Sequence, residues 1–415
     1  MPPEKLKNCQ ITNPAAAALA SCEDLMLCIL ARLPVKSICR FKSVCKPWNH
    51  LLSTQEFVKM QFKISNESKN QSFLVHRRNL YGSSPFSVFN IDSNENAKID
   101  HPFDRINIVG CCRGLVCIKR DEEFVLWNPA MNLSKTLSPL KDPEIVSLGF
   151  GYDAEGDDFK VVRLILKFKR NFGMCVSCVK VYSVNSDSWT TIEPGFQFSK
   201  LKICRNSISA IVNGNPYWVG KIDVIKRDVL ICFDMSKLVF KIVPLSSLDY
   251  NKAEHDIEFV DFNGSVGALV FTWKNRWHNE ESVEYVDSWV FDDDEQIWAK
   301  SYSVGPIDQV KMKRVLRCLK DGRVLGVRPI EPGQMIVFNS ETKYVKDLFN
   351  VGHEYFGIYD YTASLVYIEG MEKVKLKKRR DHWNKSKVFG VCLFSIMLIV
   401  SNLKYFRSSR TGKKH

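Results

Sequence analysis

The sequence predicts a mainly β protein with a small α-helical module at its N-terminus. Within residues 21–62, apolar side chains recur at helical spacings of three and four. From Ser72 onward, short runs of β-branched and aromatic residues are interrupted by Asn, Asp, Gly and Pro every six to twelve residues. A signature that repeats about every fifty residues, with about four strands per repeat, predicts that this second part is a β-propeller-like domain.

Composition divides the 415 residues into one small module, one larger domain and their connecting segments. The predicted segments are a flexible lead at 1–20, the helical module at 21–62, a polar linker at 63–71, the propeller-like domain at 72–370, and a basic tail with a short hydrophobic segment at 371–415.

Four short helices are expected in the module. Ser21 is placed to cap the first, and Pro34 ends that helix and suits the first position of the second. Pro47 has the same role for a third helix, and Ser53 or Thr54 caps the fourth. Such a small unit buries too little area to be stable alone. Its apolar surface is therefore expected either to bind a partner or to pack on the rest of the chain, and the pattern does not choose between them.

The repeat in the β domain has a polar residue at a turn between two strands, where Asn and Asp tolerate unusual backbone conformations. A period near fifty favours a propeller over a β-sandwich. To close the ring, the strands around Tyr355 and Val366 are expected to pair with early strands near Phe73–His76. The turn residues of the six copies are Asn90, Asn128, Ser183, Asp234, Asp292 and Asn339.

The net charge of +13 is concentrated in the tail, where residues 371–415 hold 13 Lys and Arg against Glu372 and Asp381. The first 370 residues carry only +2, so the charge gives no reason to expect a nucleic-acid partner. Fourteen cysteines without framework spacing suit a reducing compartment, the cytoplasm or the nucleus. Cys175 and Cys178 form an isolated CxxC, which without a second ligand pair predicts neither a metal nor a cofactor.

The tail holds an apolar run at 388–403 between basic flanks. As a helix its sixteen residues would span about 24 Å, less than the roughly 30 Å of a bilayer's hydrocarbon core. The interpretations are a C-terminal membrane anchor, a helix docked on the domain, or a translated stretch outside the usual coding boundary. The basic run at 374–380 also fits a nuclear-import patch.

The run LARLPVKSICRFKSVCKPWNHLL, Leu30 to Leu52, resembles the F-box of plant F-box proteins. In that family the F-box docks on a Skp-type adaptor, which links it to a cullin scaffold. The Leu-Pro that usually precedes the first acidic residues is replaced here by Ala20, Ser21 and Cys22, which predicts weaker adaptor binding. The resemblance implies an adaptor-binding face that includes Leu25, Ile29, Leu30, Leu33, Pro34, Val44, Cys45 and Trp48, with Arg40 and Lys42 at its rim.

The motifs GCCRGLVCI from Gly110, WNPA from Trp127 and LGFGYD from Leu148 resemble the F-box-associated domain of plant proteins, including kelch-like receptors and S-locus F-box proteins. In that family the domain recruits the target protein. The tryptophans in and near these motifs, Trp127, Trp189 and Trp298, are predicted to pack in the core. Target contacts are expected in variable loops instead, at 169–174, 221–228 and 274–284, the last with Arg276, Trp277 and His278 as binding anchors.

The resemblance implies a non-catalytic substrate receptor of an SCF-type (Skp–cullin–F-box) ubiquitin ligase, which directs its target to ubiquitylation and proteasomal degradation. One alternative is a scaffold or decoy receptor that binds targets without the adaptor. A propeller hydrolase is a lesser alternative, because it would need paired carboxylates or clustered histidines, and the eight histidines are dispersed along the chain.

Overall fold

A computed structural model describes residues 25–67, 71–77, 86–93, 96–99, 101, 103, 106–120, 123–139, 146–170, 173–195, 201–203, 210–222, 227–249, 255–274, 282–307, 310, 312–319, 321–328, 333–351 and 356–374. Several predictions lie outside these residues, among them the lead at 1–20, the cap at Ser21, the binding anchors Arg276, Trp277 and His278, and the tail from 375 onward with its hydrophobic segment at 388–403.

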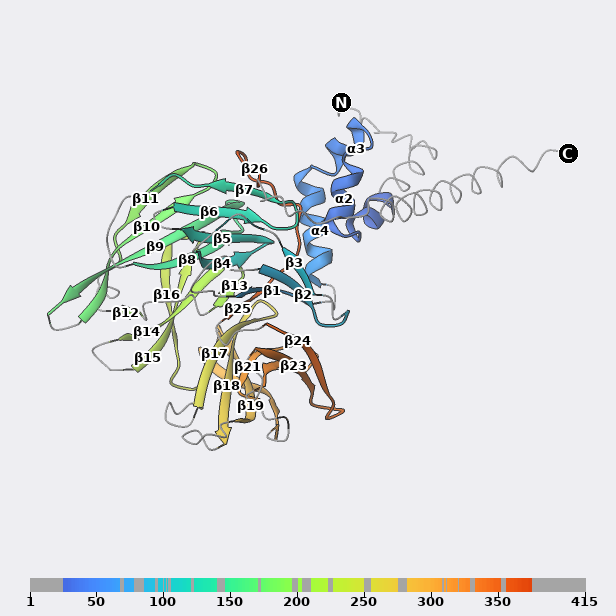
Figure 1. Cartoon of the computed structure of the whole chain (residues 1–415). Coiled ribbons are helices and arrows are strands. Elements are labelled where there is room, and N and C mark those ends of the chain that lie inside the picture. The colour runs from blue at the N-terminus through green and yellow to red at the C-terminus, as the bar shows by residue number, and fades with distance from the viewer. Residues whose placement is uncertain are drawn as a thin grey trace, which may run out of the picture. The chain divides into compact units, whose positions relative to one another are not determined.

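The helical module has the expected helices. Residues 25–31 are helical, and α2 (Val35–Phe41), α3 (Lys46–Leu51) and α4 (Gln55–Glu67) follow (Figure 1). Thr54 caps α4 as predicted, because its Oγ1 accepts a hydrogen bond from the Phe57 backbone N–H at 3.3 Å. Pro34 precedes α2 as the N-cap and is not its first residue, since its ψ of 141° is extended.

The predicted polar linker at 63–71 is helical in its first part, because α4 continues through Glu67. Gln61 Nε2 donates a hydrogen bond to Ser65 Oγ at 2.8 Å, and Thr362 Oγ1 donates one to Asn66 Oδ1 at 3.1 Å. Contacts of this kind can stabilise a final helical turn whose polar residues alone favour a loop.

The β domain is a ring of six blades, each with four antiparallel strands in order from the channel outward. Blade 1 is β25 (Phe356–Asp360), β1 (Ser72–Arg77), β2 (Phe86–Asn90) and β3 (Asn96–Ile99); blade 2 is β4 (Asn107–Cys112), β5 (Leu115–Arg120), β6 (Glu123–Asn128) and β7 (Leu133–Thr136); blade 3 is β8 (Val146–Asp153), β9 (Asp158–Lys169), β10 (Gly173–Ser183) and β11 (Ser188–Ile192).

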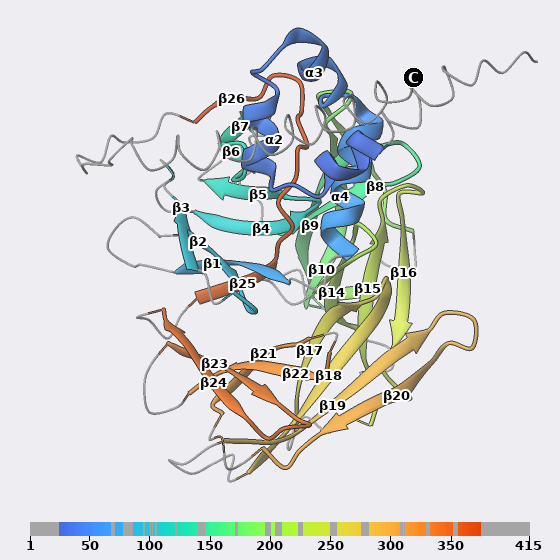
Figure 2. The ribbon, with the colours of Figure 1, turned by 90° about the vertical axis from the view of Figure 1, so that its right-hand side faces the viewer.

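The other half of the ring continues this order (Figure 2). Blade 4 is β13 (Ala210–Val212), β14 (Asn215–Ile222), β15 (Arg227–Asp234) and β16 (Val239–Pro244); blade 5 is β17 (His255–Phe262), β18 (Ser265–Lys274), β19 (Ser282–Asp292) and β20 (Ile297–Val304); blade 6 is β21 (Arg314–Cys318), β22 (Arg323–Val327), β23 (Gln334–Asn339) and β24 (Val345–Asn350).

Two short strands lie outside this pattern. β12 (Leu201–Ile203) pairs with both β10 and β14, so that blades 3 and 4 form one nine-stranded sheet. β26 (Glu372–Lys373) adds to the outer edge of blade 2 by pairing with β7.

The ring closes as the sequence predicts, by pairing of a late strand with an early one. In blade 1, Phe73 lies opposite Asp360 and His76 lies opposite Gly357. The second predicted closing run, around Val366, does not form a strand. Its carbonyl groups are used differently, because Asn128 Nδ2 donates hydrogen bonds to the backbone oxygens of Ser364 at 3.1 Å and of Val366 at 2.9 Å.

The predicted turn residues all accept hydrogen bonds from the turn that follows them. Asp292 Oδ1, for example, accepts from the backbone N–H groups of Asp294 at 2.9 Å and Glu295 at 3.0 Å. The residue four positions after each turn residue has a positive φ of 50–57° wherever it is described, which reverses the chain into the outermost strand. The same side-chain-to-backbone bonds occur at Asn90, Asn128, Ser183, Asp234 and Asn339.

Apolar clusters fill the spaces between neighbouring blades. Trp127 is fully buried and Trp298 is 4% exposed, as the sequence predicts, and the half-buried Trp189 packs on Tyr182 with ring centroids 5.2 Å apart. Gly151 in β8 is required by close approach, because a Cβ there would overlap the carbonyl oxygen of Gly214 in blade 4.

All six inner strands run in the same direction along the channel, so the two ends of the ring differ. The end that carries the turns after the first and third strands of the blades contacts the helical module and is called the helix-side face. The opposite end carries the connections between the second and third strands and between successive blades, and is called the open face.

Candidate functional site

An apolar patch of the helical module is exposed to solvent. Leu25 is 63% exposed, Ile29 54% and Val44 62%, and Pro34 and Cys45 are also exposed. Leu25 and Ile29 are four residues apart and therefore neighbours on one helix face. These five of the eight predicted adaptor contacts form the candidate adaptor face.

The other three predicted adaptor contacts are not exposed. Leu30 is 5% exposed and belongs to the core of the module, so it is not part of the exposed surface, and its contact with an adaptor stays a prediction. Leu33 and Trp48 are half-buried against the same core, where the Trp48 ring packs edge-on to Phe41 at 5.6 Å between centroids.

The module also packs on the propeller, which confirms one of the two interpretations of its apolar surface, while binding of a partner stays a prediction. Its core includes Leu365, with Ala130, Met131 and Ala363 packed around it from the propeller. The deeper face thus packs within the chain, and among the described residues the outer face is exposed.

Asp157, in the turn between β8 and β9, is the polar anchor for α4. Its carboxylate lies 2.8 Å from Lys59 Nζ and accepts hydrogen bonds from the Gln55 side chain and the Tyr152 hydroxyl. Burial opposes ionisation of Asp157, but the bonds from Lys59 and Tyr152 outweigh it and lower its pKa. Burial and the bond to Asp157 raise the pKa of Tyr152 to about 12, so the phenol remains a donor.

Arg113 connects the propeller to the same helix. Its guanidinium lies 3.9 Å from the centroid of the Tyr152 ring and 5.5 Å from that of Phe62 in α4. Arg113 has a φ of 49° and precedes Gly114, which has a φ of 79°, in the tight turn between β4 and β5. The sequence shows this residue only as part of the CCRGL motif, and nothing local in the motif indicates the contact with α4.

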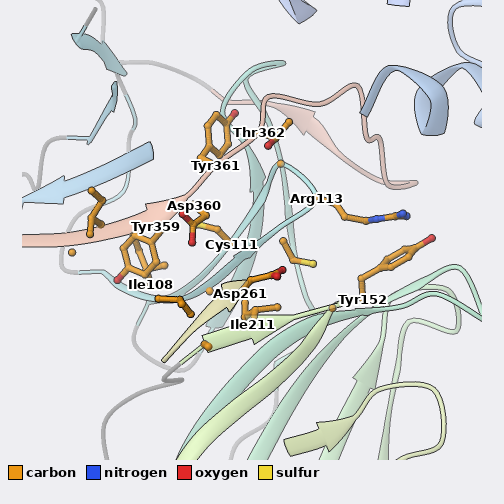
Figure 3. Close-up of a pocket in the computed structure, with 18 of the residues that line it drawn as sticks. Ile108, Cys111, Arg113, Tyr152, Ile211, Asp261, Tyr359, Asp360, Tyr361 and Thr362 are labelled. Carbon is orange, nitrogen blue, oxygen red and sulfur yellow. The ribbon is translucent and has the colours of Figure 1, made fainter. Parts of the chain in front are cut away.

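A cavity of about 1280 Å³ runs along the channel, with residues of all six inner strands in its wall and Phe62, Ser65 and Asn66 of α4 at the helix-side face. Figure 3 shows Arg113 and Tyr152 at that end and Tyr359 and Asp360 along the wall. The wall carries both signs of charge. Arg317 Nη1 lies 2.6 Å from Glu258 Oε1, and its Nε lies 3.5 Å from Asp360 Oδ2.

These two carboxylates do not resemble a hydrolytic pair, because the same guanidinium lies between them. Burial raises the pKa of Glu258, and the positive charge of Arg317 acts against that rise. In the channel both carboxylates therefore lie against a guanidinium, which favours a structural role for this ion cluster.

The three predicted target loops all follow the second strand of a blade and so belong to the open face. The described ends that flank them are Lys169 and Gly173, Ile222 and Arg227, and Lys274 and Ser282. In Figure 1 the tip of the β9–β10 hairpin points away from the helices. The candidate target loops of blades 3, 4 and 5 are thus attached at the end of the ring opposite α4.

Within the described ranges, no group of three or more His, Cys, Asp or Glu is placed to hold a metal ion. Cys175 is buried and Cys178 half-buried in β10, and neither is in a disulfide. Of the helices that the structure describes, none has the length and apolar character needed to cross a bilayer.

Comparison with known families assigns the two parts of the chain. Residues 22–60 match the F-box domain, and residues 55–368 match the F-box associated beta propeller domain. The chain belongs to the plant F-box proteins that carry an F-box-associated propeller. The F-box and propeller matches overlap at 55–60, the first half of α4, in agreement with a helix that packs in the F-box and on the propeller.

Curated relatives are F-box proteins of Arabidopsis thaliana. "F-box/kelch-repeat protein At3g23880" is 30% identical over 239 residues, which are 53% of this chain and 64% of the relative. "F-box protein At4g22390" is 26% identical over 340 residues, or 73% of this chain and 79% of the relative. The chain spans 57 to 64% of the length of the first three relatives that it matches.

Proposed function

We propose that this F-box protein is the substrate-recognition subunit of an SCF-type ubiquitin ligase. The F-box would bind a Skp-type adaptor, and through it a cullin, while the propeller binds a target protein that is then ubiquitylated and degraded. The exposed patch of Leu25, Ile29 and Val44 carries the proposal, because large apolar side chains at 54 to 63% exposure on one small module indicate a binding surface.

In this role the protein performs no chemistry of its own. It increases the effective concentration of the target beside enzymes that are bound elsewhere on the complex. Two observations support a non-catalytic subunit: its relatives are F-box proteins, and the Glu258 carboxylate in the channel is paired with Arg317. The proposed location is the cytoplasm or the nucleus, with attachment to a membrane through 388–403 as the alternative for the tail.

The adaptor step is tested by capture of a purified plant Skp-type adaptor on the full chain. We expect the wild-type chain to retain the adaptor and Leu25→Glu/Ile29→Glu to bind it at least ten-fold more weakly, because buried charge replaces apolar contacts. Tyr344→Glu is the matched control: Tyr344 is 65% exposed on blade 6, and its variant should bind normally. Failure of the wild-type chain to bind the adaptor would overturn the proposal.

An adaptor-independent scaffold or decoy is the second candidate. The absence of Leu-Pro at Ala20, Ser21 and Cys22 favours it, since this departure from the family is at the start of the F-box. Affinity capture from plant cells with the proteasome blocked separates the two candidates. A receptor recovers adaptor, cullin and ubiquitylated target together, whereas a scaffold recovers the target without adaptor.

A further inference from the structure

Ser43 lies in the turn between α2 and α3, beside the candidate adaptor face. It is exposed, and it directly precedes Val44 and Cys45, two of the five residues of that face. Ser43 Oγ donates a hydrogen bond to the backbone oxygen of Arg40 at 2.6 Å, and the Ser43 N–H donates to the same oxygen at 3.1 Å. The hydroxyl therefore helps to hold the turn that presents Val44.

The sequence around Ser43 is basic. Arg40 lies three residues before it and Lys42 one residue before it, and Lys46 follows three residues after it. Of the five Ser and Thr residues at 25–67, Ser43 alone has an arginine three positions before it. Protein kinases with carboxylates in their substrate groove select arginine at this position, because a guanidinium forms bidentate pairs with carboxylates. Such a pattern is short and common, so the surroundings of this serine must supply the rest of the argument.

The segment around Ser43 can open locally, as binding in a kinase groove requires. Within the described range 25–67, α2 is anchored by the buried Val35 and Ile38, but α3 has no buried residue. The N-cap residues of both helices make no side-chain capping bond, and helices of seven and six residues have little stability of their own. Segments with few buried contacts open at a small cost in free energy. Residues 40–46 are therefore accessible to an enzyme that binds its substrate in an extended form.

We propose that Ser43 is a phosphorylation site for a basophilic protein kinase and that its phosphorylation releases the adaptor. This inference rests on the proposed function and names a means of regulating it. The kinase transfers the γ-phosphoryl group of ATP to Ser43: the Oγ–H bond breaks, an Oγ–P bond forms, and ADP leaves with the electron pair of the broken P–O bond. The proton passes to a base of the kinase and then to solvent.

A phosphate on Ser43 removes the bond that holds the turn. Phosphoserine has no hydroxyl hydrogen to donate to the Arg40 oxygen, and its own oxygens are repelled by that carbonyl and by the others at the end of α2. The turn that presents Val44 must then rearrange. Pairing of the phosphate with the exposed Lys46 would offset the repulsion only by changing the same turn.

The phosphate also places charge on an apolar surface. About two negative charges are added next to Val44, which is 62% exposed. Contact with an apolar partner would remove water from these charges, which costs free energy. The rearranged turn and the added charge both act against adaptor binding, so the modified chain should release the adaptor.

The modification is tested on the full chain with a calcium/calmodulin-dependent protein kinase and ATP, followed by peptide mapping by mass spectrometry. We expect phosphate on Ser43, and phosphorylation of Ser43 about ten-fold slower in Arg40→Gln, which removes the guanidinium. Lys36→Gln is the matched control, because Lys36 is exposed one turn earlier on the same helix and lies outside the recognition sequence. Its effect should be less than two-fold.

The regulatory effect is measured by capture of a purified plant Skp-type adaptor on the phosphorylated and the unphosphorylated chain. We expect phosphorylation to weaken adaptor binding about ten-fold or more, and phosphatase treatment to restore it. Ser43→Ala, treated with the same kinase and ATP, should bind the adaptor as its untreated sample does, which assigns the effect to this serine. Because Ser43→Ala also lacks the bond to Arg40, its own untreated sample is the reference.

Absence of phosphate from Ser43 would overturn the inference, and so would equal adaptor binding by the phosphorylated and the unphosphorylated chain. Neither result affects the ligase role, because the unmodified chain still binds the adaptor in both. Failure of the unmodified chain to bind the adaptor overturns the ligase role, and with it the regulation of adaptor binding. The peptide mapping of Ser43 does not depend on the adaptor, so the two failures are distinguishable.

Discussion

Arg317 Nη1 lies 2.6 Å from Glu258 Oε1, across the boundary between blades 6 and 5. The same guanidinium donates from Nη2 to the backbone oxygen of Ile358 at 3.1 Å and lies near Asp360, both in blade 1. One side chain thus ties together the blade where the ring closes and the two blades that precede it. The Arg317 side chain is 15% exposed and that of Glu258 30%, so this ion pair is partly shielded from solvent.

Arg317→Leu is expected to destabilise the propeller by about 3 kcal/mol, because it leaves the Glu258 carboxylate without its partner in a partly buried site. The free energy of unfolding from chemical denaturation measures the effect. Arg328→Ala is the control: it breaks the exposed pair with Asp347 in blade 6 and should cost less than about 1 kcal/mol. Equal losses in both variants would show that Arg317 does not hold the ring together.

Asp153 should make stability depend on pH at the acidic end. Burial opposes its ionisation, but bonds from the Gly156 backbone, Lys160 and Ser236 lower its pKa from 3.8 to about 2. The ionised group therefore adds about 2 kcal/mol of stability above pH 4, which is lost as pH falls toward 2. The free energy of unfolding should be lower for Asp153→Asn than for wild type at pH 7, and this difference should disappear near pH 2. A difference in free energy that does not change with pH would contradict this cause.

Arg113→Asn should loosen α4 without unfolding the ring. Asn tolerates the positive φ at this position but removes the cation that lies against Tyr152 and Phe62. A loss of about 1 kcal/mol corresponds to roughly five-fold faster amide exchange in α4. Hydrogen exchange measured by mass spectrometry tests this, with Lys63→Gln on the same helix as the control. Unchanged exchange in α4 would exclude Arg113 as a link between the two parts.

Lys343→Gly should stabilise the protein. Lys343 has a φ of 56° in the turn after Asn339, a conformation that glycine adopts without the Cβ clash of other residues. The gain is expected to be about 0.5 kcal/mol, since the added freedom of the unfolded chain offsets part of the relief. Glu341→Gly in the same turn, where φ is not positive, should destabilise instead. Thermal unfolding of the two variants and the wild-type chain tests this prediction. A melting temperature of Lys343→Gly below that of wild type would contradict it.

The features that the sequence predicts correctly depend on local chemistry. Asp292 and its counterparts form turns because their side-chain oxygens bond to the backbone two and three residues ahead, and that relation is visible in the sequence. Trp127 and Trp298 are large and apolar, so their burial follows from composition. The pairing of β1 with β25 follows from the need of a ring to have no free edge.

The features that the sequence does not predict depend on contacts between residues that are distant along the chain. The extra length of α4 involves Thr362, which lies 296 positions after its partner Asn66. The burial of Leu30 likewise depends on a core that includes the distant Leu365 of the propeller. Similarly, β12 joins two blades, and no local signal in Leu201–Ile203 indicates two strand partners.

The closure of blade 1 also has a consequence for synthesis. β1 leaves the ribosome early, but its partner β25 begins at Phe356, after the strands of the other five blades have been translated. Until then the nascent chain carries an unsatisfied strand edge that can pair with other chains. Premature termination anywhere before Phe356 should therefore produce an aggregating fragment, however many blades it contains.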